Sequence, residues 1–142
     1  MTYKTTGGFT LMEILMYLVI VGILSSIVMS AIIVARESGI DTGIKANLAQ
    51  IRTEATNFFD SNGNFGTPGV SCAEVGSLFE DERIARQILS AETASGRPAT
   101  CANSATDWVI SVPLQHEAGS WCVDEQGTGR SGTANTATIE CE

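Results

Sequence analysis

The longest apolar pattern in the chain begins close to its N-terminus. Residues 14–35 form a run of 22 positions without a charge. As a helix this run would be roughly 33 Å long, which is enough to cross a hydrocarbon core of about 30 Å. The pattern therefore predicts a helix that starts at Phe9 and whose first half, residues 9–35, lies in a membrane or in an equally apolar environment.

A narrower apolar pattern follows that run. Apolar residues recur at spacings of three and four, at Ile40, Ile44, Leu48, Ile51, Ala55 and Phe58. At about 100° per residue they fall within an arc of roughly 80°, whereas Asp41, Lys45, Arg52 and Glu54 lie outside it. We expect residues 36–60 to continue the same helix and to pack on a globular head formed by residues 61–142. The turn formers of residues 60–64 end the helix.

The head begins with a second predicted helix, over residues 73–91. Ser71 is placed to cap it, and Glu74 follows at the spacing of a capping box. The residues that this helix would bury are Val75, Leu78, Phe79, Ile84, Ile88 and Leu89. The small polar residues of 95–105 predict a loop.

The last third of the chain has the alternating pattern of strands. Residues 108–112 alternate and stop at Pro113, residues 115–119 can turn the chain, and residues 121–123 return it. A glycine-rich loop leads to a third predicted strand, 136–141. The fold class expected from these elements is α+β, with one long helix packed on a small antiparallel sheet.

One carboxylate, Glu13, stands at the start of the apolar run. A charge at that depth costs a few kcal/mol or more unless it is paired, and the run itself contains no cation. Residues 1–8 form a short polar leader that ends in a glycine pair, so the small residues precede the apolar stretch, the reverse of a secretory signal. A cut after Gly8 would leave an α-amine on Phe9, and that amine could neutralise Glu13 of a neighbouring copy.

These residues, Gly8 to Glu13 followed by the apolar run, resemble the start of the type IV pilins and of the type II secretion pseudopilins. The resemblance covers about the first third of the chain. It implies leader cleavage between Gly8 and Phe9 by a membrane prepilin peptidase, N-methylation of Phe9, and assembly into a helical filament driven by a cytoplasmic ATPase. Phe9 and Glu13 would be the assembly residues, and Gly22 matches a helix glycine that is common in the family.

The function that the resemblance implies is that of a structural subunit of a type IV pilus. Such a subunit is a single-pass protein of the bacterial inner membrane before assembly and then part of a cell-surface pilus. Its partners would be further copies of itself, the prepilin peptidase and methyltransferase, the assembly platform and the bilayer. The alternatives are a pseudopilin of a type II secretion or competence system, or a membrane-anchored binding protein that does not polymerise.

The net charge and the cysteine content add two expectations about the head. The chain of 142 residues has a net charge of −8, which argues against a basic surface for nucleic acid. Four cysteines follow the apolar run, at Cys72, Cys101, Cys122 and Cys141. They allow three disulfide connectivities, of which we favour Cys72–Cys101 and Cys122–Cys141. Each would close a loop worth roughly 3 to 3.5 kcal/mol, and the C-terminal pair also resembles the disulfide-bounded loop of many pilins.

Other candidate chemistry in the chain has simpler interpretations. Residues 127–132 match G-x-G-x-x-G but precede a poor helix former, so we expect a connecting loop. Residues 80–82 are acidic and lie close to two arginines, which indicates a solvated surface. Asp124 and Glu125 are too few ligands for calcium, a zinc site lacks a C-x-x-C pair, and His116 is expected to be solvated. Trp108 and Trp121 are expected to face each other across a hairpin. No catalysis, cofactor or metal is predicted.

Overall fold

The computed structural model describes residues 8–127 and 129–142, so most of the predicted leader lies outside the described residues. The chain forms two units, the first ending at Arg36 and the second comprising Glu37–Glu142. Helix α1 (Leu11–Asn62) supplies the described helical residues of the first unit and continues into the second. It begins two residues after the predicted start and ends two residues after the predicted end, and it is unbroken at Gly39 and Gly43.

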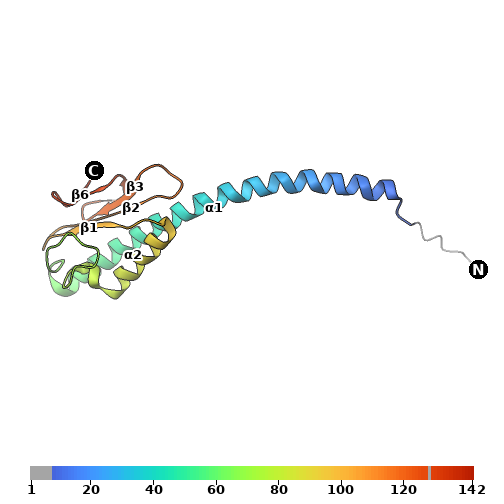
Figure 1. The fold of residues 1–142 in the computed structure, drawn as a ribbon. Coiled ribbons are helices and arrows are strands. Elements are labelled where there is room, and N and C mark those ends of the chain that lie inside the picture. Colours follow the sequence, from blue (N-terminus) through green and yellow to red (C-terminus); the bar gives the residue numbers. More distant parts are fainter. Residues whose placement is uncertain (1–7, 128) are drawn as a thin grey trace, which may run out of the picture. The chain divides into compact units, whose positions relative to one another are not determined.

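The second unit, which we call the head, combines helices with a small sheet (Figure 1). After α1 come the 3-10 helix η1 (Leu78–Glu80) and helix α2 (Glu82–Ser95). The strands are β1 (Thr100–Asn103), β2 (Trp108–Pro113), β3 (Ser120–Asp124), β4 (Arg130–Ser131), β5 (Ala134–Asn135) and β6 (Glu140–Cys141). Strands β1 to β4 form one antiparallel sheet in chain order, and β5 pairs with β6. The expected α+β layout of a long helix and a small antiparallel sheet is thus present.

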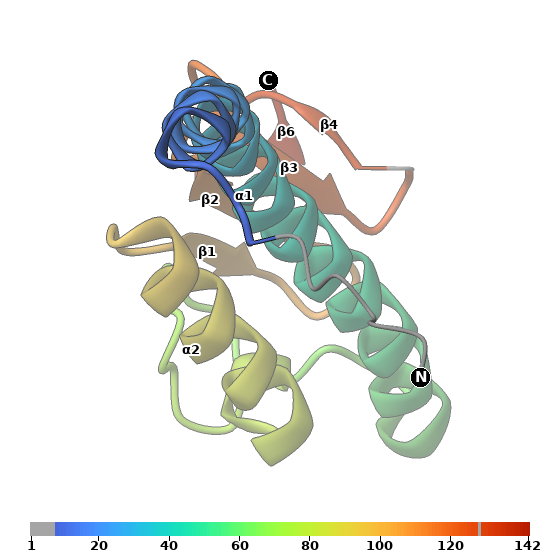
Figure 2. The ribbon, with the colours of Figure 1, turned by 90° about the vertical axis from the view of Figure 1, so that its right-hand side faces the viewer.

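Three layers make up the head. Figures 1 and 2 show α2 and the head's part of α1 on one face of the sheet, with β6 beyond the opposite face. Because side chains of a strand alternate between faces, Trp108, Ile110 and Val112 join the core beneath the helices, whereas Val109 packs toward β5 and β6. The sheet is therefore covered on both sides, which explains why nearly all of β2 is buried.

The helix face of this core confirms the predicted stripe of α1. Ile44, Leu48, Ile51 and Ala55 are completely buried, and Ile40 and Phe58 pack against them while partly exposed. Helix α2 adds a second stripe at helical spacing, made of Ile84, Ile88, Ala91 and Ser95. For α1, the periodicity of the sequence is sufficient to identify the side of the helix that faces the sheet.

The two disulfides lie on opposite faces of the sheet. Cys72 is bonded to Cys101, which belongs to the core under the helices, and Cys122 is bonded to Cys141 in the cluster on the other face. This is the sequential pairing favoured from the sequence. One bond ties the loop after α1 to β1, and the other ties the C-terminal ribbon to β3.

The predicted helix over residues 73–91 is wrong in its first half. Helix α2 starts at Glu82 and is capped by Asp81, not by Ser71. The Ser71–Glu74 spacing instead closes a local turn, in which the hydroxyl of Ser71 accepts the N–H of Ala73. Gly76 has a φ of +78° and its carbonyl accepts the N–H of Thr67, so the backbone leaves helical geometry there.

Two residues expected in the core of that helix are therefore exposed. Val75 lies in the turn and is 74% exposed, and Leu89 lies on the outer side of α2 and is 63% exposed. Leu78, Phe79, Ile84 and Ile88 are buried as predicted.

Three expectations about the last third also need correction. Residues 100–103 of the predicted loop are strand β1, because backbone pairing with β2 outweighs their small polar character. The third predicted strand is reduced to β6, since Asn135 Oδ1 accepts the N–H groups of Ala137 and Thr138 and turns the chain. The two tryptophans do not face each other, because Trp121 pairs with Val112 and Trp108 pairs with Asn103.

Candidate functional site

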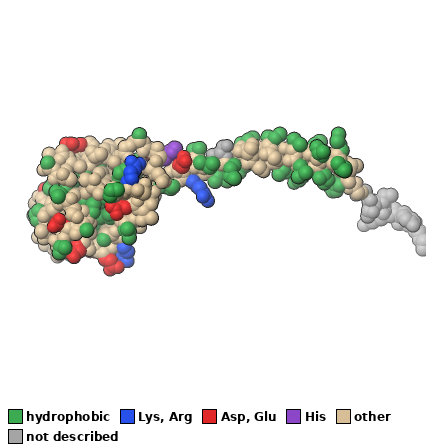
Figure 3. All heavy atoms as spheres, in the orientation of Figure 1, with side chains coloured by type: hydrophobic (Ala, Val, Ile, Leu, Met, Phe, Trp, Pro, Cys, Tyr) green, Lys and Arg blue, Asp and Glu red, His purple; other side chains and the backbone are tan. Residues whose placement is uncertain are grey.

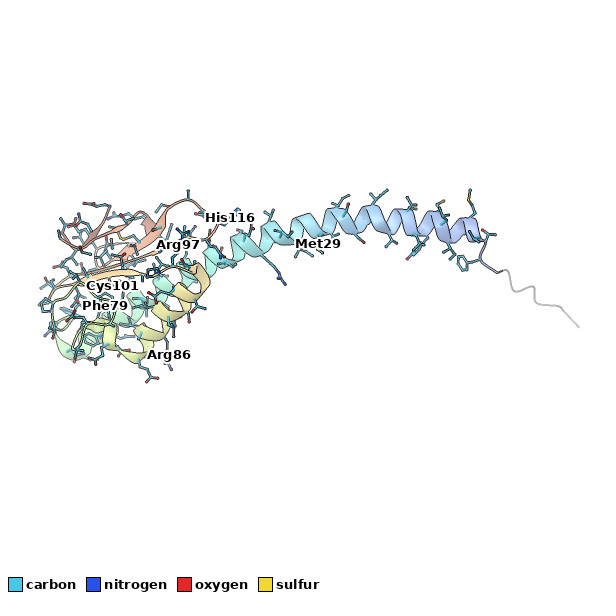
Figure 4. The ribbon with its side chains drawn as sticks, in the orientation of Figure 1. Met29, Phe79, Arg86, Arg97, Cys101 and His116 are labelled. Atoms are coloured by element: carbon cyan, nitrogen blue, oxygen red, sulfur yellow. A yellow bond between two sulfur atoms is a disulfide. The ribbon has the colours of Figure 1, made fainter. Side chains whose placement is uncertain are left out.

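Almost all described apolar side chains of the first unit are exposed. From Phe9 to Val34 the large apolar residues range from 39% exposed, at Val21, to 83%, at Leu11. Figure 3 shows these side chains along the whole segment, and the labelled Met29 in Figure 4 points away from the helix. In water such a surface is far larger than a soluble protein normally leaves uncovered. Among the described residues, α1 is the one helix that is long and apolar enough to cross a membrane.

The start of this apolar helix is a capping box. The Oε2 atom of Glu13 accepts hydrogen bonds from the backbone N–H and the hydroxyl of Thr10, each at 3.2 Å. In return, the Thr10 hydroxyl accepts the N–H of Glu13 at 3.3 Å. The T-x-x-E spacing of this arrangement satisfies donors that a helix start leaves without partners. The sequence offers no cation for Glu13 within its own segment; this uncharged partner, Thr10, was missed, although the T-x-x-E spacing was its signal.

These hydrogen bonds do not neutralise the carboxylate. Both donors of Thr10 are uncharged and both bind Oε2, and among the described residues no ion pair joins a cation to Glu13. Oε1 accepts no hydrogen bond from a described residue. Phe9, Tyr17 and Ile20 border a shallow recess on the same side of the helix as Glu13. Glu13 is thus a charge held in a fixed direction on an apolar wall.

A second carboxylate, Asp41, has a role that the sequence did not reveal. It lies outside the apolar stripe of α1, yet it is only 1% exposed. Its oxygens accept the backbone N–H groups of Gln115, His116 and Glu117 at distances between 2.7 and 3.3 Å. These amides belong to the turn of residues 114–119 between β2 and β3, which we call the β2–β3 turn. No pattern in the chain marks this contact, because it joins segments more than 70 residues apart.

The contacts of Asp41 make its ionised form the favoured one. Burial alone raises the pKa of this carboxyl, but the backbone N–H groups of Glu117, Gln115 and His116 together outweigh it, so the pKa lies below its ordinary value. The pKa of Asp81 is lowered in the same way: burial raises it, and the hydrogen bonds of Arg83 outweigh the burial. Both groups therefore stabilise the head most above the pKa of an unfolded aspartate, about 3.9.

This direction gives a testable pH dependence. Asp41→Asn is expected to lower the free energy of unfolding by a few kcal/mol at neutral pH, because hydrogen bonds to a charged group are worth about 1.5 to 3 kcal/mol. The difference between the natural chain and the variant should shrink as the pH falls below about 4 and the native Asp41 becomes protonated. Denaturant unfolding at pH 7, 5, 4 and 3 measures it. A difference that stays constant over this range would contradict the assignment.

The sequence suggested that His116 is simply solvated, but the structure places it beside a carboxylate. Its Nδ1 atom lies 3.0 Å from Glu37, and both side chains are about half exposed. Figure 4 shows His116 at the β2–β3 turn, beside α1. Lys45 completes the contacts of this turn, with its Nζ 2.7 Å from Glu117 and 4.8 Å from the ring centre of Trp121.

The remaining candidates have structural explanations. In the acidic run of residues 80–82, Asp81 and Glu82 pair with Arg83 and Arg86, as expected for a surface. Asp124 is buried, and its Oδ2 accepts hydrogen bonds from Arg130 and from the N–H of Cys141. It therefore holds the C-terminal ribbon on the sheet. Within the described ranges no group of three or more His, Cys, Asp or Glu side chains could hold a metal ion.

The glycine-rich loop is shaped by its neighbours. A Cβ at Gly129 would lie 2.5 Å from Trp121 Nε1, so this glycine permits the loop to pass close to the indole. Strand β4 begins in the same loop and pairs with β3. No helix opens after Gly132, so the loop lacks the context of a dinucleotide site.

Comparison with known proteins does not assign a family: no protein-family model, no curated protein and no solved structure matches this chain. Of the predicted site residues, Phe9 and Glu13 lie together at the head of the exposed helix, and the four cysteines form two disulfides.

Proposed function

We propose that the chain is a structural subunit of a type IV pilus. The observation that carries the proposal is the carboxylate of Glu13, fixed at the start of the apolar part of α1, whose large apolar side chains are exposed from Phe9 to Val34. A helix of this kind requires two things from its surroundings: an apolar cover and a cation near its N-terminus. A bilayer supplies the cover but not the cation.

Parallel packing of identical processed chains would supply both. The apolar side chains of one helix would cover those of its neighbours, so the helices could leave the bilayer for a shared core. Hydrolysis of the Gly8–Phe9 peptide bond would create an α-amine that is protonated at neutral pH. The Oε1 atom of Glu13, which lacks a described donor in the single chain, is then the natural acceptor for the Phe9 amine of another copy. The pairing would fix the axial register of the helices.

The head fits the part of such a subunit that faces an oxidising environment. Disulfides are typical of small extracytoplasmic domains that have a small hydrophobic core, and the head has two. Insertion as a single-pass protein of the bacterial inner membrane, with assembly platform and peptidase as partners, and later presence in a cell-surface pilus are parts of the same proposal.

Processing is the first prediction of this proposal. Mass spectrometry of the chain recovered from cell envelopes is expected to find an N-terminus at Phe9, with the added mass of a methyl group on its amine. The comparison variant is Gly8→Ala. A Cβ at this position has no neighbour within 4 Å among the described residues, so any loss of processing would reflect recognition by the peptidase and not misfolding. Only full-length chains in assembled material would contradict the prediction.

A pseudopilin of a secretion or competence system shares the same N-terminal features and is the principal alternative. Two observations favour the pilin. The head has two disulfides, and Asp124, which was considered as a calcium ligand, is instead paired with Arg130. Electron microscopy of sheared surface material separates the two, because a pseudopilin should be missing from long extracellular fibres. A non-polymerising, membrane-anchored binding protein would instead keep its leader and remain a monomer in detergent.

A further inference from the structure

The β2–β3 turn and the end of β2 that leads into it are attached to α1 on one side and, on the other, to the last residue of α2 and to Arg97 just after it. On the side of α1, Asp41 accepts three of its backbone N–H groups, while Glu37 pairs with His116 and Lys45 with Glu117. Because these three helix residues are spaced four apart, they lie above one another on one face of α1. On the other side, Ser95 Oγ donates to the carbonyl of Pro113, and Arg97 donates to the carbonyl of Leu114 at 2.6 Å.

The segment of α1 under this turn is a weak helix by itself. Residues 37–43 contain two glycines, and each costs about 1 kcal/mol relative to alanine in a helix interior. Ser38, Asp41 and Thr42 also have low helix propensity. Neither Gly39 nor Gly43 has a neighbour within 4 Å of a Cβ built on it, so packing does not require these glycines.

Apolar packing does little to hold the same residues in place. The first fully buried apolar side chain of α1 is Ile44, and within residues 37–43 the apolar contribution is the partly exposed Ile40. The one fully buried side chain of that segment is Asp41. Docking of residues 37–43 on the head therefore depends mainly on polar contacts with the β2–β3 turn.

We propose that the β2–β3 turn controls local unfolding of residues 37–43. The controlling contact is the set of hydrogen bonds from the three backbone N–H groups of the turn to the Asp41 carboxylate, which we call the latch. When the three amides leave Asp41, the buried charge loses its partners, and a weak helical segment remains with little to keep it helical. The segment then opens as a unit while the core from Ile44 onward stays folded. Opening at this position uncouples the apolar helix from the head, directly after the apolar run ends.

The charged side chains around the turn contribute less to holding residues 37–43 in place than Asp41 does. Glu37, Lys45, His116, Glu117 and Arg97 surround the turn, and all are partly or largely exposed. Exposed ion pairs contribute little to stability, whereas a buried carboxylate with several N–H donors contributes more. The proposal therefore assigns control to Asp41 and a minor part to the pairs around it. It concerns the single chain and holds whether or not the chain polymerises.

Hydrogen–deuterium exchange of the full chain in detergent micelles tests the latch. In Asp41→Asn, amide exchange should accelerate about tenfold or more in residues 37–43 and in residues 115–117, with little change in α2 and in β2. Asp60→Asn is the matched control, because it makes the same change at an exposed position of the same helix and should leave both segments unchanged. Unchanged exchange in residues 37–43, or equal acceleration throughout the head, would overturn the proposal.

A second variant keeps the test valid if Asp41→Asn does not fold. With Asp41 intact, Gly39→Ala combined with Gly43→Ala should slow exchange of residues 37–43 by about tenfold or more, because it strengthens the helix without a steric conflict. If Asp41→Asn does fold, adding the two alanines should restore slow exchange in residues 37–43 but not in residues 115–117. An absence of any slowing by the alanines would show that local helix strength does not set the opening, and would contradict the latch.

Discussion

Replacing Glu13 with glutamine is expected to abolish filaments while the head remains folded. Glutamine keeps the size of the side chain and can still accept hydrogen bonds from Thr10, but it cannot pair with a protonated Phe9 amine. The amine of each neighbour would then be buried among apolar helices without a counter-charge. Removal of one partner from a buried ion pair typically costs about 3 to 5 kcal/mol, and this cost would recur at every subunit added. Electron microscopy and a shearing assay measure the yield of fibres.

Two further variants separate the charge of Glu13 from its capping role. Thr10→Val removes the hydroxyl that contributes to the capping box but leaves the carboxylate, so it should weaken the first turn of α1 and still permit filaments. Glu82→Gln neutralises an acid whose side chain is 85% exposed on the head, and normal filaments are expected. Abundant normal filaments from Glu13→Gln would refute the assembly role of the charge.

Loss of the Cys122–Cys141 disulfide is expected to lower the free energy of unfolding of the head by about 3 kcal/mol. Replacing both cysteines with alanine releases a loop of 19 residues in sequence separation, for which the chain-entropy model assigns about 3 kcal/mol. Single domains are stable by only about 5 to 15 kcal/mol. Strands β4, β5 and β6 have two residues each, too few to hold the C-terminal ribbon on the sheet by backbone pairing alone.

Denaturant unfolding followed by tryptophan fluorescence measures this loss, since Trp108 is buried and Trp121 lies on β3 beside Cys122. The corresponding double alanine variant at Cys72 and Cys101 is the comparison. It should lose a similar amount, but exchange should accelerate in the loop before η1 and not in the C-terminal ribbon. A loss below about 1 kcal/mol for Cys122→Ala with Cys141→Ala would contradict the stapling role.

The periodic parts of the fold could be predicted from the sequence. The stripe from Ile44 to Ala55 is buried as its spacing indicates, and β2 ends at Pro113 as the pattern predicts. The first prediction depends on which face of the helix is apolar, and the second on a proline that cannot continue the strand. Both signals are local. The sequential disulfide pairing was favoured among three connectivities, and the resemblance of the C-terminal pair to the disulfide-bounded loop of many pilins supported Cys122–Cys141; the structure confirms both bonds.

The polar contacts could not be predicted in the same way. A capping-box spacing occurs at Thr10 and Glu13, where the box is present, and also at Ser71 and Glu74, where a turn forms instead. The spacing alone does not distinguish the two, because Gly76 and the Cys72 disulfide decide the second case. The contacts of Asp41 were even less predictable. Its partners are backbone N–H groups, which every residue except proline carries, so no pattern of residue types marks them.

The account depends most on the contact of Glu13 with the processed N-terminus of another copy. A cryo-EM structure of fibres sheared from cells that produce this chain tests it most directly. The account predicts the Phe9 amine of one subunit within hydrogen-bonding distance of the Glu13 carboxylate of another, inside a core formed by the apolar halves of α1. Fibres in which Glu13 contacts water or a cation of its own chain would contradict it.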